Sequence, residues 1–129
     1  MKSSNLLSLA NVAKEAAKNA GKNLFKEFQK PQEVLLSKGR DIKLAVDEVA
    51  EKIIIDYLKE GSKLPILSEE AGITDDLGSE FWVVDPLDGT SNFFRSIPIC
   101  SSSISLIKDG SPCIGVIYDF LNDNLYWGA

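Results

Sequence analysis

Residues 82–93 read WVVDPLDGTSNF, a stretch that combines strand-forming residues, two acids, a turn and a hydroxyl. Residues 81–84 are aromatic and β-branched, which predicts a core strand that delivers Asp85 to its carboxyl end. Because Pro86 has no N–H to donate, we expect the hydrogen-bond ladder of this strand to stop there. The stretch therefore predicts a buried strand that ends at an acid.

The turn after this strand places Asp88 three residues beyond Asp85. It can fold both carboxylates and the Leu87 carbonyl toward one point, and converging hard oxygens suit Mg²⁺. Gly89 lets the backbone approach a ligand closely, and Thr90 supplies a hydroxyl and an N–H where a helical turn can begin, a place where anions bind. The alternative from these residues alone is a type I turn with two solvated acids, because Pro, Asp and Gly are ordinary turn residues.

The composition is that of a soluble globular protein, with 44% hydrophobic and 26% charged residues, and 129 residues fit one domain. No apolar run approaches the roughly 20 residues needed to cross a bilayer. The N-terminus alternates apolar residues with Lys and Glu and shows no signal-peptide core. We therefore expect a cytoplasmic protein without a membrane partner.

The chain is acidic, with 14 basic and 19 acidic residues, which argues against a nucleic-acid partner because phosphate binding normally needs a basic stripe. It contains no histidine, which excludes Ser-His-Asp triads, Cys-His pairs and His-ligated zinc from this chain. Cys100 and Cys113 are isolated in apolar segments and are predicted to be core thiols. An acidic protein without histidine that handles anions points to carboxylates and metal ions.

Two amphipathic helices are predicted. Apolar side chains recur at helical spacing over residues 6–28, with Pro31 just beyond, and again over residues 46–58, where Gly61 is placed to close the helix. Asp47 lies in the first turn of the second helix, so a purely structural role at the helix dipole is one interpretation of it. Three charged residues of this helix are predicted to face solvent: Glu48, Glu51 and Lys52.

Between these helices and after them the pattern changes to short strands. Residues 32–41 predict an irregular or hairpin connection, and residues 64–67 form an apolar strand that carries Glu69 and Glu70 at its carboxyl end. Residues 72–78 read as a surface loop. From residue 99 onward, two runs flank Asp109-Gly110 and a last strand follows at 125–127, which predicts an antiparallel meander.

Four acids stand at element ends: Asp47, Glu69, Asp85 and Asp88. Three or four carboxylates around one site suit a pair or trio of divalent cations. Such cations polarise a phosphoryl oxygen, lower the pKa of water and stabilise a leaving alkoxide. The predicted chemistry is phosphate ester hydrolysis.

The pair Glu69-Glu70, the stretch 82–93 and Pro98 resemble the signature of the inositol monophosphatase family, magnesium-dependent and lithium-sensitive phosphomonoesterases. The resemblance covers nearly the whole chain, because further residues fall at the family's spacing: Lys38, Asp41, Asp47 and Glu51. It implies an α+β fold of the sugar phosphatase type, with layers of helices and antiparallel sheet. It also implies a homodimer and a small phosphorylated polyol or sugar as substrate.

The resemblance implies two or three Mg²⁺ ions, with lithium as an inhibitor. Glu69, Asp85 and the Leu87 carbonyl would hold the first ion, and Asp85 with Asp88 would hold the second.

The remaining roles are also implied by the resemblance. Gly89 and Thr90 would offer backbone N–H groups to the phosphate, and Thr90 with Asp47 would orient the attacking water as general-base machinery. Glu70 and Lys38 would be auxiliary residues.

Three departures from the family pattern bear on these expectations. Residues 42–47, Ile-Lys-Leu-Ala-Val-Asp, are closer to members that also cleave fructose 1,6-bisphosphate, and Arg95 stands where many relatives have histidine. Family members are roughly twice this length, and their second half carries a Trp-Asp motif whose acid completes the second metal site. Residues 1–129 are therefore expected to be an incomplete N-terminal metal-binding domain, either a fragment or a truncated product, with weak or no turnover.

The resulting prediction is a Mg²⁺-dependent phosphomonoesterase that hydrolyses inositol monophosphate or related sugar phosphates. A fructose 1,6-bisphosphatase, with or without dual activity, is the alternative within the enzyme class. A non-catalytic protein-binding relative is the alternative outside it, because some bacterial relatives act through protein partners. A nucleotide 3′-phosphatase is disfavoured, because that branch usually has Lys-Glu-Phe where this chain has Ser91-Asn92-Phe93.

Overall fold

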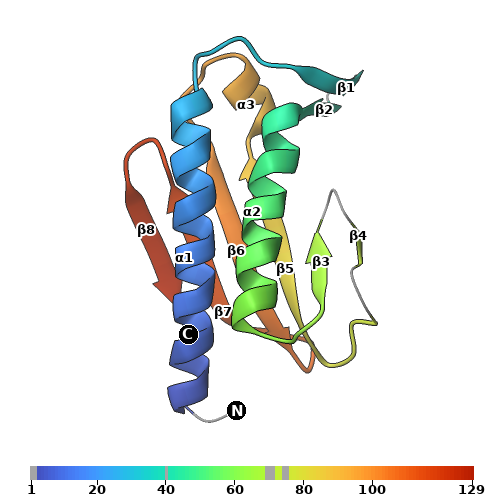
Figure 1. The fold of residues 1–129 in the computed structure, drawn as a ribbon, viewed down its shortest axis with the longest axis vertical. Helices are drawn as coiled ribbons and strands as arrows, with labels where there is room; N and C mark the ends of the chain where they lie inside the picture. The colour runs from blue at the N-terminus through green and yellow to red at the C-terminus, as the bar shows by residue number, and fades with distance from the viewer. Residues whose placement is uncertain (1–2, 40, 69–71, 74–75) are drawn as a thin grey trace.

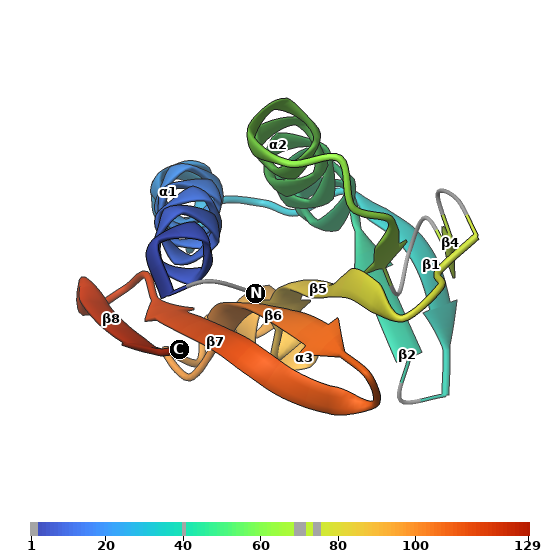
Figure 2. The same cartoon turned by 90° about the horizontal axis from the view of Figure 1, so that it is seen from below.

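Two long helices lie side by side on one face of a sheet (Figures 1 and 2). The computed structural model describes residues 3–39, 41–68, 72–73 and 76–129. Its helices are α1 Ser3–Glu27, α2 Ala45–Gly61 and α3 Thr90–Phe94. Its strands are β1 Val34–Lys38, β2 Asp41–Leu44, β3 Ile66–Ser68, β4 Gly72–Ile73, β5 Glu80–Asp88, β6 Ser101–Lys108, β7 Ser111–Asp119 and β8 Asn124–Gly128.

The large sheet has the strand order β4-β3-β5-β6-β7-β8 over the described residues. β3 and β5 are parallel, and the other neighbouring pairs are antiparallel. The segment predicted to be irregular or a hairpin is a hairpin, in which β1 pairs with β2 as a separate small sheet. The predictions of a layered α+β fold and of an antiparallel meander at the end of the chain are confirmed.

The inner face of α1 is built from alanine. Five alanines of this helix are fully buried: Ala10, Ala13, Ala16, Ala17 and Ala20. These short side chains favour the helix and let its backbone lie close to the sheet. Gly21 continues the stripe, and a Cβ added there would lie 2.4 Å from the ring of Tyr118 on β7. Residue 21 is therefore small because α1 and β7 meet at this point.

The substitution Gly21→Ala is expected to lower the free energy of unfolding by about 2 kcal/mol, because the added methyl overpacks the contact with Tyr118. Urea unfolding followed by circular dichroism measures this loss. Lys22→Ala, at the exposed neighbouring position, is the control and is expected to change stability by no more than about 0.5 kcal/mol. Equal stability of the two variants would contradict the close approach of α1 and β7.

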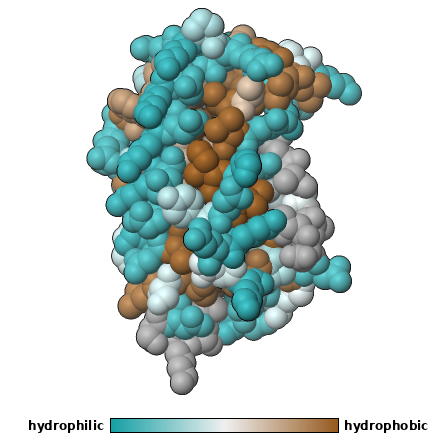
Figure 3. All heavy atoms as spheres, in the orientation of Figure 1, coloured by the Kyte–Doolittle hydropathy of each residue, from teal (hydrophilic) through white to brown (hydrophobic). Residues whose placement is uncertain are grey.

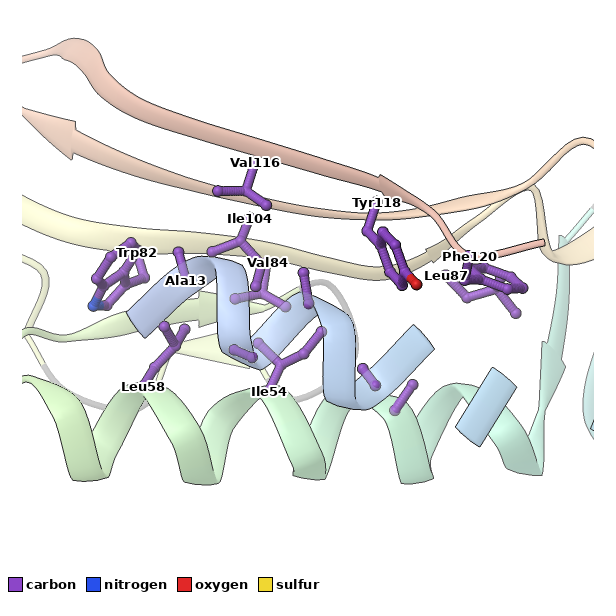
Figure 4. Packing of buried hydrophobic residues seen from close by; sticks show 14 of the residues in the cluster. Ala13, Ile54, Leu58, Trp82, Val84, Leu87, Ile104, Val116, Tyr118 and Phe120 are labelled. Carbon is purple, nitrogen blue, oxygen red and sulfur yellow. The ribbon is translucent and has the colours of Figure 1, made fainter. Parts of the chain in front are cut away.

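The core lies between the helices and the sheet. In Figure 4, Val84 and Ile104 point from the sheet toward Ile54 and Leu58 of α2, and all four are buried. Figure 3 shows hydrophilic side chains on the outer surface of the helices and hydrophobic ones in the band between them. Trp82, fully buried on β5, donates its indole N–H to Ser62 Oγ at 2.9 Å, which satisfies its one polar group. Residues 81–84 thus form the predicted core strand.

One expectation about where a strand ends needs correction. β5 does not stop at Pro86 but continues to Asp88, and its register with β6 shifts between Asp85 and Asp88. The missing N–H of Pro86 therefore falls in an irregular part of the ladder, where it costs little. The Pro86 carbonyl accepts a hydrogen bond of 2.7 Å from the buried Ser102 hydroxyl.

Gly61 ends α2 as predicted, and packing rather than backbone conformation explains why this residue is glycine. It is not among the glycines with positive φ, and the next residue, Ser62, is extended. A Cβ at Gly61 would lie 2.6 Å from the methyl groups of Val12 on α1. Close packing of the two helices, rather than a left-handed cap, explains this glycine.

Glu51 was predicted to face solvent, and this prediction is wrong. Its side chain is buried, whereas Glu48 and Lys52 are exposed as expected. Position 51 lies one helical turn after Asp47 and three residues before the buried Ile54, so it falls on the inner face of α2.

No helix in the described part of the chain is long and apolar enough to cross a membrane.

Candidate active site

A cavity of about 640 Å³ opens where the carboxyl end of β5, the start of α2, α3 and the β1–β2 hairpin come together. Six of the predicted site residues line it: Asp47, Asp85, Leu87, Asp88, Gly89 and Thr90. They come from two segments that are about 40 residues apart in the chain. The fold therefore brings together every predicted site residue that the structure describes, except Lys38.

Asp47 is buried at 2% exposure, and each of its carboxylate oxygens accepts a hydrogen bond. The backbone N–H of Leu44 donates to Oδ2 at 2.8 Å, which supports the start of α2. The Thr90 hydroxyl lies 3.2 Å from Oδ1. One oxygen of Asp47 therefore supports the start of α2, and the other faces Thr90.

The Thr90 hydroxyl has a single proton and two acceptors within reach. Asp47 Oδ1 lies at 3.2 Å and the Leu87 carbonyl oxygen at 3.1 Å. Since a hydroxyl also has two lone pairs, it can accept a hydrogen bond from a further group while donating to one of these oxygens. The geometry allows Thr90 to link a bound molecule to the Asp47 carboxylate.

Gly89 joins β5 to α3 in the left-handed region, with φ 89° and ψ 37°. A Cβ there would lie 2.8 Å from the Ile99 carbonyl oxygen, a backbone atom. Its own carbonyl accepts the Phe93 N–H at 2.9 Å and so begins α3. Both its conformation and its surroundings require glycine at this position.

The donor atoms of the cavity fit a hard cation. Asp85 and Asp88 supply carboxylates and Leu87 a carbonyl, the ligand types that Mg²⁺ takes. Glu69 and Glu70 lie outside the described residues. Within the described residues, no group of three or more His, Cys, Asp and Glu side chains is arranged to hold a metal ion. The chemistry of the donor set thus agrees with the predicted Mg²⁺ site, and the ligand roles remain predictions.

Lys38 is exposed on β1 and is not among the residues that line the cavity. Another basic residue of the hairpin, Lys43 on β2, does line it, and its ammonium group lies 3.3 Å from Glu48 Oε1. Lys43 was not predicted to be a site residue. Its place four residues before Asp47, on the strand that leads into α2, is the signal that could have indicated it.

A second cavity, of about 510 Å³, shares Asp88, Gly89 and Asn92 with the first. Cys100 lines it and is 9% exposed. Burial, and after it the negative charges of Asp119 and Asp88, raise the pKa of the Cys100 thiol from 9.0 to about 11. This agrees with the prediction of an unreactive thiol.

Alkylation of Cys100 by iodoacetamide at pH 8 is expected to be roughly 100-fold slower in the folded chain than in urea, because a pKa of about 11 in place of 9.0 reduces the thiolate by that factor. A Cys113→Ser background leaves Cys100 as the single thiol, and mass spectrometry follows its modification. The urea-unfolded sample is the control. Equal rates in the two states would contradict the raised pKa.

The chain is similar to known proteins over most of its length. The chain is 38% identical over 129 residues to the fructose-1,6-bisphosphatase/inositol-1-monophosphatase of Aquifex aeolicus, covering 97% of this chain and 48% of that protein. It is 39% identical over 119 residues to the Nus factor SuhB of Xylella fastidiosa, covering 90% of this chain and 43% of that protein. The chain thus spans about half the length of these curated relatives.

The fold is similar to that of a solved structure of a related protein. The crystal structure of the extragenic suppressor protein suhB from Bartonella henselae superposes with a TM-score of 0.85 at 36% identity, covering 92% of this chain and 47% of that chain. The family match itself extends over residues 5–129, and so includes nearly all of α1 and the whole of α2 and α3, together with the strands around the cavity. On sequence, fold and the residues gathered at the cavity, this chain belongs to the inositol monophosphatase family.

Proposed function

We propose that this chain is the N-terminal, metal-binding part of a Mg²⁺-dependent phosphomonoesterase that hydrolyses inositol monophosphate or a related sugar phosphate. The observation that carries the proposal is the hydrogen bond between Thr90 and the buried Asp47 at a cavity that Asp85 and Asp88 also line. Hydrolysis assisted by a metal ion requires a general base and hard oxygen ligands, and a hydroxyl paired with a fixed carboxylate next to such ligands meets both requirements.

The charge of the cavity supports a cation in it. Among the residues that the structure describes, four carboxylates line it, from Asp41, Asp47, Asp85 and Asp88, against one ammonium group from Lys43. A phosphate monoester brings further negative charge, so repulsion would exclude it unless cations compensated these acids. We propose that Asp85, Asp88 and the Leu87 carbonyl hold Mg²⁺ together with Glu69. When bound, Mg²⁺ would polarise the phosphoryl group and make water more acidic.

The chain's own groups would orient and accept the proton of the attacking water. The Leu44 N–H holds Asp47 Oδ2, so the carboxylate cannot turn away and Oδ1 stays toward Thr90. Thr90 can donate a hydrogen bond to Oδ1 and accept one from water at the same time. Asp47 would then act as the general base, through the Thr90 hydroxyl. Gly89 lines the cavity with backbone atoms alone, so a phosphate can approach them.

The test is Mg²⁺-dependent phosphate release from inositol 1-phosphate and from fructose 1,6-bisphosphate, run on the 129-residue chain and on the full product of its gene. We expect weak or no turnover by the chain alone, because its relatives are about twice as long. We expect the full product to turn over substrate only with Mg²⁺, and we expect Li⁺ to inhibit this turnover. The ratio of the two rates decides between the inositol phosphate and the bisphosphate. Family-like turnover by the 129-residue chain would show that it needs no further part.

A protein-binding function is the second candidate, because a relative that is 39% identical is named a Nus factor. The two candidates differ in what they require of Asp85. A phosphatase requires its carboxylate, whereas a binding function that does not use the metal would persist in Asp85→Asn. Recovery of the same protein partner with both forms, without Mg²⁺-dependent turnover in either, would favour the second candidate. The homodimer and the cytoplasmic location are parts of the phosphatase proposal.

A further inference from the structure

Glu51 is a buried acid for which the proposed function has no role. Its carboxylate oxygen Oε2 accepts a hydrogen bond of 2.7 Å from the hydroxyl of Ser68, and the two residues are 9% and 1% exposed. Removing a carboxylate from water is costly, and a short hydrogen bond from a buried hydroxyl offsets part of that cost. A buried acid tied to one particular residue suggests a role in positioning that residue.

Ser68 is the last residue of β3, the parallel neighbour of β5. In the register of these strands, Ser68 lies opposite Val84, the residue directly before Asp85. The carboxyl ends of both strands therefore lie at the same edge of the sheet, where parallel strands of α/β proteins commonly present functional groups.

Helix α2 forms hydrogen bonds at the ends of both strands. Its Asp47 accepts a hydrogen bond from Thr90, which follows β5, and its Glu51 accepts one from Ser68, which ends β3. The two acids are four residues apart, so they lie on one face of the helix, about 6 Å apart along its axis. α2 thus presents two carboxylates in a row, one for each strand.

The end of β3 has little else in the described part of the chain to hold it. β3 contains three residues, and its other neighbour, β4, contains two. Such short ladders contribute few backbone hydrogen bonds. A charge-assisted side-chain bond at the last residue is therefore a large share of what fixes this strand end.

We infer that Glu51 is a positioning residue: by holding the hydroxyl of Ser68, it fixes the end of β3 against α2 and β5. The residue that follows Ser68 in the chain is Glu69, which the proposed function assigns to Mg²⁺, and the inference rests on that proposal. In this inference Glu51 acts on the metal site through Ser68.

The test is a calorimetric Mg²⁺ titration of the full product of the gene, without substrate. Glu51→Ala and Ser68→Ala each remove one partner of the bond, and each is expected to weaken Mg²⁺ affinity roughly 10-fold or more, as losses of residues that orient metal ligands do. The double variant is expected to bind Mg²⁺ no more weakly than the weaker of the two single variants, because both changes remove the same hydrogen bond. Glu51→Gln keeps an oxygen that can accept the Ser68 hydroxyl and is expected to stay within about 3-fold of the unaltered protein.

Glu48→Gln, an exposed acid of the same helix, is the matched control and is expected to bind Mg²⁺ unchanged. Circular dichroism establishes that each variant is folded, and Ser68→Ala decides the matter if Glu51→Ala does not fold. Unchanged affinity in folded Ser68→Ala would overturn the inference. An equal loss in Glu51→Gln and Glu51→Ala would also overturn it, because the charge of Glu51 would then act by itself. Absence of Mg²⁺ binding by the unaltered protein would refute the proposed function, and the inference with it.

Discussion

Asp85→Asn is expected to reduce Mg²⁺-dependent phosphate release by the full product of the gene at least 100-fold, and to weaken Mg²⁺ affinity by a similar factor. The change keeps the shape of the side chain but removes the negative charge of a residue that lines the cavity between β5 and α2. If it removes about 3 kcal/mol of stabilisation of the transition state, the rate falls roughly 100-fold. Initial rates at saturating Mg²⁺ and calorimetric titration measure the two losses.

Asp56→Asn is the control for this experiment. Asp56 is an exposed acid on α2 that forms an ion pair with Lys52 at 2.8 Å, so it has the same chemistry away from the cavity. An exposed pair of this kind contributes little, and we expect activity and Mg²⁺ affinity to be unchanged. Asp85→Asn with the activity of the control would contradict the metal site.

Gly89→Ala is expected to lower the free energy of unfolding by about 3 kcal/mol. An L-residue in the left-handed region costs about 1–2 kcal/mol, and the new Cβ would lie 2.8 Å from the Ile99 carbonyl, a backbone atom that cannot move aside easily. Urea unfolding measures the loss. The turn that carries Asp88 into α3 must shift to admit the methyl group, so we also expect phosphate release to fall at least 10-fold.

Two other glycines separate the causes of this loss. Gly110 has a φ of 82° but open space around it, so Gly110→Ala measures the conformational cost alone, about 1 kcal/mol. Gly115 has open space and is not among the positive-φ glycines, so Gly115→Ala is expected to change stability by less than about 0.5 kcal/mol. If Gly89→Ala were no worse than Gly110→Ala, the close contact with Ile99 would be refuted.

Most helices and strands of this fold could be predicted from the sequence, because their signals are local. Helical spacing predicted α1 and α2, and Asp109-Gly110 predicted the β6–β7 hairpin. The acid-rich end of β5 was also predicted from residues that are neighbours in the chain. Such patterns depend on a period of a few residues, and the fold did not need to be known to read them.

Contacts between residues that are distant in the chain could be established only from the folded structure. Thr90 and Asp47 are 43 positions apart, and no local pattern contains their hydrogen bond. The burial of Glu51 also depends on a partner from another element, since a helix presents this acid inward only if something such as Ser68 receives it.

The reason for Gly61 likewise lies outside its own segment. A glycine at a helix end fits both a left-handed cap and a close contact, and the position of Val12 on α1 decides between them. The local sequence determines backbone conformation through sterics and periodicity. The burial of charge and the close approach of helices depend on packing between distant segments, so these features could be established only from the folded chain.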